Sequence, residues 1–157
     1  MPMSLPDVSA IKKLEVENNL SFWSEADYVS ELERDDSIAL VAKTSGNLSG
    51  FIISRLITSQ IVLSDNFSMV KESEVEIYNL AVKREFRGIG IGKILLKKSL
   101  EYYSKDNISN IWLDVRESNL VAQEFYMKQG FEVIYERKNF YRDPVEDGLV
   151  MCWNLRK

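Results

Sequence analysis

A glycine-rich segment, REFRGIGIGK at residues 84–93, constrains the fold more than any other part of the sequence. It follows a predicted strand over residues 76–82 and precedes a predicted helix from Ile91 to Tyr103. A strand that enters such a turn and then a helix leaves unpaired backbone N–H groups at the helix N-terminus, where the helix dipole favours anions. The segment is therefore predicted to bind phosphate. The helix carries apolar residues on more than one stripe, so we expect it to be largely buried.

The spacing within this segment excludes two familiar nucleotide-binding patterns. A P-loop has the pattern G-x-x-x-x-G-K followed by Ser or Thr, but Arg87 stands in place of its first glycine and Ile94 follows Lys93. The dinucleotide pattern G-x-G-x-x-G would need a glycine where Lys93 stands. The pattern that does fit is R-x-x-G-x-G, formed by Arg87, Gly90 and Gly92.

Composition removes further classes of function. The 157 residues are enough for one domain, over residues 1–157, with its own hydrophobic core. The net charge of −4 argues against a nucleic-acid partner. Histidine is absent and Cys152 is the single cysteine, so we expect no metal site of the zinc type and no histidine-activated nucleophile. Cys152 lies in an apolar run and is predicted to be a buried thiol.

The same counts bear on location. One cysteine allows no intrachain disulfide, which suits a reducing compartment. The first residues lack the apolar stretch of a secretory signal, and no run approaches the ~20 apolar residues of a membrane span. We therefore expect a cytoplasmic protein without a membrane partner.

The remaining segments predict an alternation of strands and helices. We expect helices that begin at Asp7 and at Ser24, then a hairpin over residues 38–53 that turns at Ser45–Asn47. Residues 59–73 are interpreted as a long loop or a ragged extension of that hairpin. The second half predicts a parallel strand covered on both faces at 111–115, a helix between Asn119 and Gly130, and strands at 133–135 and 149–155.

In this context the R-x-x-G-x-G segment resembles the loop with which the GCN5-related N-acetyltransferases hold the pyrophosphate of coenzyme A. Within that superfamily, the sequence is similar to the Rim-type enzymes that acetylate the N-terminal alanine of a small-subunit ribosomal protein. The segments that carry the similarity are the loop and residues 77–82, 112–119, 125–126, 130–131 and 137–141. The resemblance implies an α/β (α+β) GNAT fold, with a mixed central sheet of six to seven strands that splays between strands 4 and 5 and is flanked by about four helices.

The resemblance also implies acetyl-CoA as cofactor and assigns the residues that contact it. The strand residues would pair with the pantetheine amides, the loop would hold the diphosphate, and Asn119 would bind the pantetheine arm. These residues are Leu80, Ala81, Val82, Arg87, Gly88, Ile89, Gly90, Ile91, Gly92, Lys93 and Asn119. Two alternatives stay open: the glycines only permit tight helix–strand packing, and Asn119 is a plain helix N-cap.

For the chemistry, acetyl transfer to an amine needs a base for the amine and a proton for the departing thiolate. Tyr126 matches the family tyrosine near the coenzyme sulfur and is assigned as the general acid. Glu76 and Asp114 are the candidate bases, with Glu76 slightly favoured. Asp114 stands where the Rim-type pattern commonly has glutamate, and its side chain is one methylene shorter.

The acceptor side is less constrained. Phe22 and Trp23 resemble one family segment of the peptide groove, and Asn139, Phe140 and Tyr141 resemble another. The favoured acceptor is therefore a ribosomal protein N-terminus. A small amine such as a polyamine, amino acid or aminoglycoside is the nearest alternative, followed by a non-catalytic coenzyme-A-binding module. A homodimer is left open.

Overall fold

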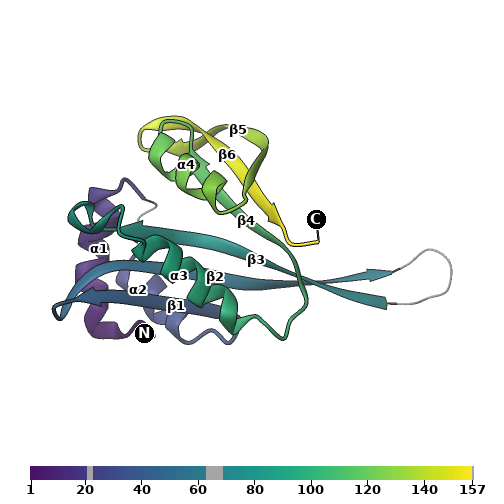
Figure 1. Ribbon diagram of the computed structural model, residues 1–157, viewed down its shortest axis with the longest axis horizontal. Coiled ribbons are helices and arrows are strands. Elements are labelled where there is room, and N and C mark those ends of the chain that lie inside the picture. Colours follow the sequence, from purple (N-terminus) through teal and green to yellow (C-terminus); the bar gives the residue numbers. More distant parts are fainter. Residues whose placement is uncertain (21–22, 63–68, 157) are drawn as a thin grey trace. The chain divides into compact units, whose positions relative to one another are not determined.

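The computed structural model describes residues 1–20, 23–62 and 69–156, which include four α-helices and six strands (Figure 1). The helices are α1 (Val8–Glu17), α2 (Glu25–Leu32), α3 (Ile91–Tyr102) and α4 (Leu120–Lys128), with short 3-10 helices η1 (Leu5–Asp7) and η2 (Arg84–Phe86). The strands are β1 (Ser37–Thr44), β2 (Asn47–Val62), β3 (Met69–Val82), β4 (Ile108–Arg116), β5 (Glu132–Arg142) and β6 (Val145–Asn154). None of the described helices is long and apolar enough to cross a membrane.

The strands form one mixed sheet in the order β1-β2-β3-β4-β6-β5. β3 and β4 are parallel, as expected for strands joined through a helix, whereas β1 with β2, β4 with β6 and β5 with β6 are antiparallel. The β3–β4 ladder ends at Ile77 and Leu113, although β3 itself continues to Val82. The predicted α/β class with a mixed sheet and four helices is confirmed. The segment before η1 contributes only an isolated bridge between Pro2 and Leu40.

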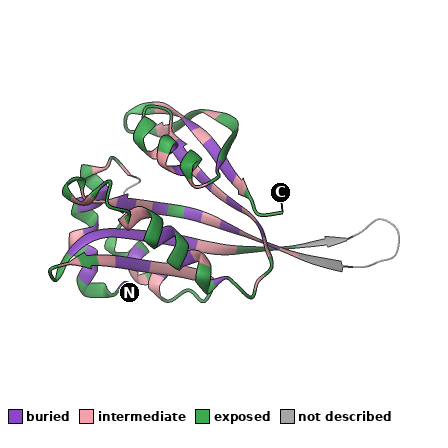
Figure 2. Cartoon of the chain, viewed as in Figure 1, coloured by how far each residue is buried: buried purple, intermediate pink, exposed green. Residues whose placement is uncertain are grey.

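Contacts divide the chain into two compact units, one with residues 1–56 and 78–105 and the other with residues 57–77 and 106–157. The core of the first unit lies where α1 and α2 pack on β1 and β2 (Figure 2). Its fully buried members include Ile11, Leu14, Tyr28, Phe51 and Ile53. The predicted helix α1 is thus observed, and it buries the face that carries Val8, Ile11 and Leu14.

Polar residues at the starts of the first two helices behave differently from each other. Ser24 caps α2 as predicted: its Oγ accepts from the Asp27 amide at 3.1 Å, and the Asp27 carboxylate accepts from the Ser24 amide at 2.7 Å. Asp7 stands before α1 but makes no cap hydrogen bond there. Its carboxylate instead accepts from Ser4 at 2.7 Å and pairs with Lys43 at 2.7 Å.

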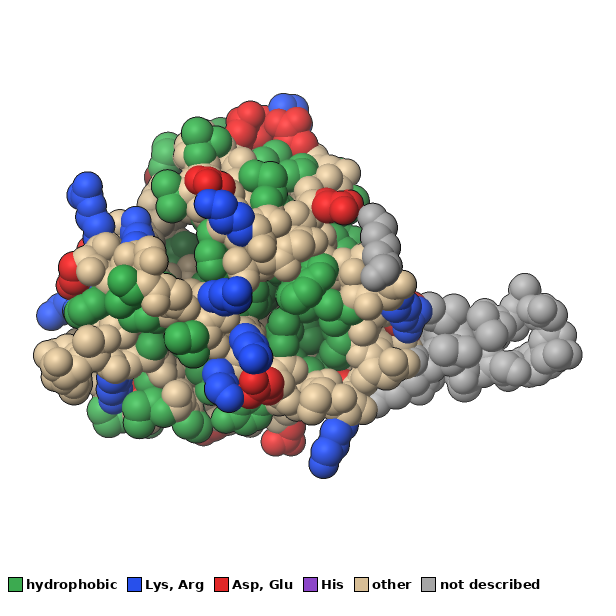
Figure 3. All heavy atoms as spheres, viewed as in Figure 1, with side chains coloured by type: hydrophobic (Ala, Val, Ile, Leu, Met, Phe, Trp, Pro, Cys, Tyr) green, Lys and Arg blue, Asp and Glu red, His purple; other side chains and the backbone are tan. Residues whose placement is uncertain are grey.

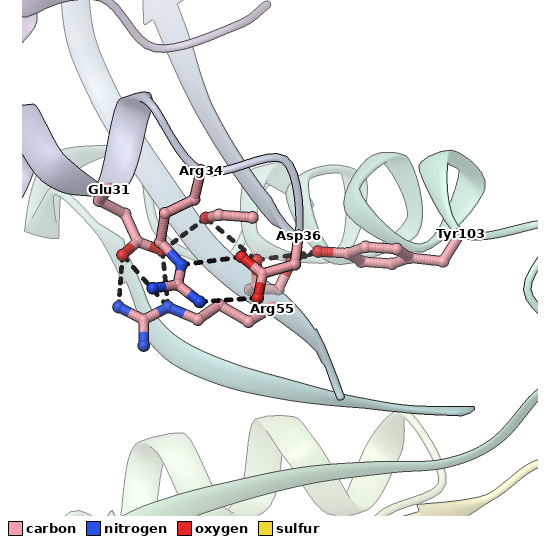
Figure 4. Close-up of polar contacts among 7 residues, drawn as sticks. Glu31, Arg34, Asp36, Arg55 and Tyr103 are labelled. Atoms are coloured by element: carbon pink, nitrogen blue, oxygen red, sulfur yellow. Dashed lines mark hydrogen bonds and ion pairs between the residues drawn. The ribbon is translucent and has the colours of Figure 1, made fainter. Parts of the chain in front are cut away.

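The helix α3 is buried on one face only, so the prediction of a largely buried helix is wrong. Ile94 and Tyr102 are exposed, whereas Leu95, Leu96 and Ser99 are buried. A buried polar chain fixes the end of this helix on β2. The Ser99 and Ser54 hydroxyls lie 2.6 Å apart. The hydroxyl of Tyr103, labelled in Figure 4, donates to the Ser54 carbonyl at 2.8 Å.

In the second unit, α4 follows β4 and its ends match the prediction. Asn119 Oδ1 accepts from the Ala122 amide at 3.1 Å, and Gly130 has a left-handed φ of 102°. The strand β4 alternates buried and half-buried residues, so it is not covered equally on both faces as predicted. Cys152 is buried on β6, which confirms the expected thiol environment.

The ambiguous residues 59–73 extend the β2–β3 hairpin, since β2 continues to Val62 and β3 begins at Met69. The hairpin alternative is therefore the one observed over the described part of this segment. The strands β5 and β6 also extend beyond the predicted stretches towards the turn that joins them, to Arg142 and from Val145. Their ladder has register shifts between Val133 and Tyr135 and between Arg137 and Tyr141.

Candidate active site

The glycine loop in the first unit has the geometry of an anion cradle. Gly88 and Gly90 have positive φ values of 78° and 91°, and Gly90 is the N-cap of α3 without a side-chain cap. A Cβ atom built at either glycine would meet nothing within 4 Å, so these two glycines are not there to permit close packing. The first hydrogen bond of α3 runs from the Ile94 amide to the Gly90 carbonyl at 3.0 Å, which leaves the preceding amides without intrahelical acceptors.

The charged side chains around the loop are of two kinds: one arginine that hydrogen-bonds to other elements, and lysines that are exposed on α3. Arg87 Nε donates to the Val82 carbonyl at 3.0 Å and Nη2 donates to Asn18 Oδ1 at 2.5 Å, so this guanidinium ties the loop to β3 and α1. Lys93 and Lys97 are exposed one turn apart on α3, and Figure 3 shows Lys and Arg side chains over this helix. The loop residues thus fit a diphosphate: backbone amides would bind it, and exposed lysines would add screened attraction.

An aromatic cluster belongs to the same unit. The Trp23 ring lies 5.3 Å from the Tyr28 ring and 6.2 Å from the Tyr78 ring. The Arg55 guanidinium stands 4.2 Å from the centre of the Tyr78 ring and pairs with the buried Glu31 (Figure 4). Tyr78 and Arg55 were not predicted as site residues, because their contact depends on strand pairing. Phe22, predicted beside Trp23, lies outside the described residues.

In the second unit, the two candidate bases lie near each other on β3 and β4. Glu76 is paired in register with Trp112, two residues before Asp114. Asp114 Oδ1 is buried without a hydrogen-bond partner in the described structure, and Oδ2 lies 3.5 Å from Arg137 Nη1. Burial raises the pKa of Asp114, Arg137 opposes that rise, and the charge of Glu76 adds to it. Such a half-buried carboxylate is able to accept a proton.

Tyr126, the predicted acid, is buried on α4 between two aromatic rings. Its ring centre lies 5.1 Å from that of Phe125 and 5.4 Å from that of Phe131. Burial raises the pKa of the Tyr126 hydroxyl, and the nearby Tyr141 adds to that rise. The phenol therefore keeps its proton at neutral pH and is available as a proton or hydrogen-bond donor.

The predicted acceptor residues on β5 form a bulge. Arg137 pairs with Gly148 and Tyr141 pairs with Glu146, so the three residues 138–140 of β5 stand opposite the single residue Asp147 of β6. Asn139 has a positive φ of 51°, and its amide donates to Asp147 Oδ1 at 2.7 Å. The bulge is stabilised by that carboxylate.

The rings of Phe140 and Tyr141, in and directly after this bulge, each contact another strand. Phe140 packs on Gly148, where an added Cβ would lie 3.0 Å from the ring. Tyr141 lies under the Arg116 guanidinium at 4.2 Å. The predicted acceptor residues Asn139, Phe140 and Tyr141 thus lie in or directly after this bulge.

The model of the Acetyltransferase (GNAT) family matches residues 8–131. The chain belongs to this family. It is therefore an acetyltransferase, and the expected cofactor, acetyl-CoA, follows from membership of the family.

Named relatives and solved structures agree with this assignment. A Bacillus subtilis (strain 168) protein with a provisional name as a ribosomal protein bS18-alanine N-acetyltransferase is 31% identical over 150 residues, which are 95% of this chain and 90% of that protein. The Escherichia coli (strain K12) ribosomal protein bS18-alanine N-acetyltransferase is 26% identical over 148 residues, or 93% and 90%.

The crystal structure of the ribosomal-protein-S18-alanine N-acetyltransferase from Escherichia coli has a TM-score of 0.75 at 24% identity and covers 99% of this chain and 92% of its own. Chaetomium thermophilum Naa20, solved with a bisubstrate analogue, has a TM-score of 0.83 at 21% identity and coverage of 99% and 86%. At these identities the two structures show a shared fold. The predicted GNAT fold is thereby confirmed.

Proposed function

We propose that this chain transfers an acetyl group from acetyl-CoA to the N-terminal alanine amine of a ribosomal protein. The observation that carries the donor assignment is the open cradle at Gly88 and Gly90, whose left-handed backbone precedes the free amides of α3. The acceptor assignment is supported by the relatives named above, which align over more than nine-tenths of this chain. A ribosomal acceptor also favours a cytoplasmic location.

The chain's own residues divide the work of binding. The amides of Gly88 to Lys93 hold the diphosphate, and Arg87 keeps the loop fixed to β3 and α1. The backbone of Leu80 to Val82 at the end of β3 would receive the pantetheine arm. Asn119 caps α4, and the family resemblance assigns it to the same arm. Bound acetyl-CoA supplies the activated thioester.

Proton transfer falls to a carboxylate and a phenol because the chain has no histidine. An α-amino group has a reference pKa near ~7.7–8.0, so roughly a tenth is neutral at pH 7 and the base has little to do. Glu76 or Asp114 takes the proton of the acceptor ammonium. Tyr126, whose raised pKa keeps it protonated, returns a proton to the leaving sulfur.

The acceptor would be held by aromatic side chains rather than by a charged pocket. The bulge residues Asn139, Phe140 and Tyr141 of the second unit offer rings and backbone groups that suit an extended peptide N-terminus. In the first unit, Trp23 offers a further ring face. Within the described residues, the carboxylates Glu146 and Asp147 beside the bulge are already paired with Arg116 and Lys138. Specificity would then come from shape and from the aromatic rings.

A coenzyme-release assay tests this proposal. Acetyl-CoA is supplied with peptides that begin with Ala, Ser or Met, and separately with polyamines, amino acids and aminoglycosides. Selective turnover of Ala-initiated peptides is expected. Turnover only of small amines would refute the acceptor assignment, and coenzyme binding without any turnover would refute the enzymatic one.

The Tyr126→Phe variant then tests the acid. Turnover should fall by a factor of the order of 10²–10⁴, with little change in coenzyme affinity, because only the proton donor is removed. Phe125→Leu is a useful partner variant, since it perturbs the same aromatic packing without removing a hydroxyl. Near-normal turnover of Tyr126→Phe would show that the phenol is a packing residue.

A further inference from the structure

Arg137 on β5 connects one candidate base to the acceptor segment through three contacts. Its Nη1 lies 3.5 Å from Asp114 Oδ2, and its Nη2 donates to the Tyr135 hydroxyl at 3.1 Å. The guanidinium also stands 5.0 Å from the centre of the Phe140 ring. The Arg137 side chain is 40% exposed, so it contacts Asp114 from the surface rather than from the core. The family resemblance described above gives Arg137 no catalytic or binding role.

Asp114 is surrounded by groups that respond to its charge. Glu76 approaches from β3, while Arg137 and Tyr141 approach from β5. The β6 residue in register with Asp114 is Val150, which carries no charge. Among the described residues, Arg137 is the one cation within 4 Å of this carboxylate. Arg137 therefore balances both the burial of Asp114 and the repulsion from Glu76.

The position of Arg137 in β5 makes the contact consequential for the acceptor. Arg137 is in register with Gly148 and is the last such residue before the bulge of residues 138–140. The Phe140 ring lies against Gly148 and within 5.0 Å of the guanidinium, although the side chain is partly open to solvent. An ion pair at Asp114 thus also fixes where Phe140 lies.

Resting on the proposed function, we infer that Arg137 is a positioning residue for acetyl transfer, which holds the Asp114 carboxylate ionised and fixes Phe140 beside it for the acceptor N-terminus. In the proton step, an N–H bond of the acceptor ammonium breaks, its electron pair stays on nitrogen, and the proton bonds to the unpartnered Asp114 Oδ1. Asp114, rather than Glu76, is then the base whose ionisation limits the rate at low pH.

The sign of the effect follows from the contacts. Arg137 lowers the pKa of Asp114, so its removal should let the carboxylate take up a proton at a higher pH. An opposite charge close to a carboxylate favours its ionised form, and the exposure of Arg137 places this effect at the weak end for such pairs. The acid limb of kcat/KM should therefore move to higher pH, with about tenfold lower activity on that limb.

The experiment compares Arg137→Gln and Arg137→Lys with wild type and with Lys128→Gln, which removes an exposed positive charge of the same unit at its ion pair with Glu124. The first readout is the pH profile of kcat/KM with an Ala-initiated peptide. The second is a carboxyl ¹³C NMR titration of Asp114 without peptide or coenzyme, assigned by the loss of its signal in Asp114→Asn. Thermal melts confirm that each variant is folded.

We expect both the acid limb and the Asp114 titration to move up in Arg137→Gln, to move less in Arg137→Lys, and to stay in place in Lys128→Gln. An unchanged titration in Arg137→Gln would overturn the ion pair. A shifted titration with an unmoved acid limb would overturn Asp114 as the limiting base and leave Glu76. Absence of turnover by wild type with every peptide and amine would instead refute the proposed function, and the titration would still decide whether Arg137 controls Asp114.

Discussion

Glu15 on α1 provides a direct test of how burial acts on a carboxyl group in this fold. Its side chain is 1% exposed and lies in the core beside Tyr28, and burial raises its pKa from 4.5 to about 7. The Tyr28 hydroxyl, the charge of Lys12 and the Trp23 amide oppose that rise without cancelling it. Ionised Glu15 therefore destabilises the folded chain.

The magnitude follows from linkage. A carboxyl whose pKa is higher in the folded state binds its proton more tightly when folded, so stability is complete below pH 4.5 and declines as the pH rises to about 7. Each pKa unit is worth ~1.4 kcal/mol, so the interval between 4.5 and about 7 predicts a loss of about 3 kcal/mol. Above that interval, the loss is constant.

Urea denaturation of wild type, Glu15→Gln and the exposed neighbour Glu17→Gln measures this loss. The free energy of unfolding of Glu15→Gln should exceed that of wild type by roughly 2–3 kcal/mol near pH 8, and the excess should vanish near pH 4.5. Glu17→Gln should follow wild type throughout. An excess stability of Glu15→Gln that does not change with pH would refute the reasoning, because it would show that folded Glu15 does not ionise between pH 4.5 and pH 8 with a raised pKa.

Three other substitutions test the loop and the first unit. Gly90→Ala should lower the free energy of unfolding by about 1–2 kcal/mol, because φ is 91° there, and it should weaken acetyl-CoA binding in calorimetry; unchanged affinity would count against the cradle. Gly50→Ala should destabilise by roughly 1–3 kcal/mol, since its Cβ would lie 2.8 Å from the Ala81 carbonyl oxygen, and a thermal melt equal to wild type would contradict that close approach. Glu31→Gln should lose about 3 kcal/mol in urea denaturation, because Arg55 would keep only a neutral partner, and a loss below ~1 kcal/mol would show that water replaces the carboxylate.

Local signals predicted the features that depend on neighbours in sequence. The Ser24–Asp27 capping box, the Asn119 cap and the left-handed Gly130 were all predictable, because each involves backbone groups within a few residues. The loop at Gly90 belongs to the same class, since the glycine spacing itself encodes the backbone conformation.

Features that depend on strand pairing were not predictable in the same way. The pairing of Arg137 with Asp114 joins β5 to β4, and nothing near either residue in sequence indicates it. The bulge after Arg137 depends on Asp147 of the neighbouring strand. The burial of α3 was overestimated because Ile94 is apolar yet exposed, which the helical period alone does not reveal.

The buried hydroxyls at the end of α3 bear on how this scaffold could be altered. Ser99 and Tyr103 hold the helix to Ser54 of β2, about 14 Å and about 20 Å along the helix axis from Gly90 at 1.5 Å per residue. Rotating α3 or shifting it by one residue would break these hydrogen bonds. They therefore fix the position of the helix on β2 from a point remote from the glycine loop. The sequence of the loop can therefore be changed by mutation or by design while α3 keeps its position on β2.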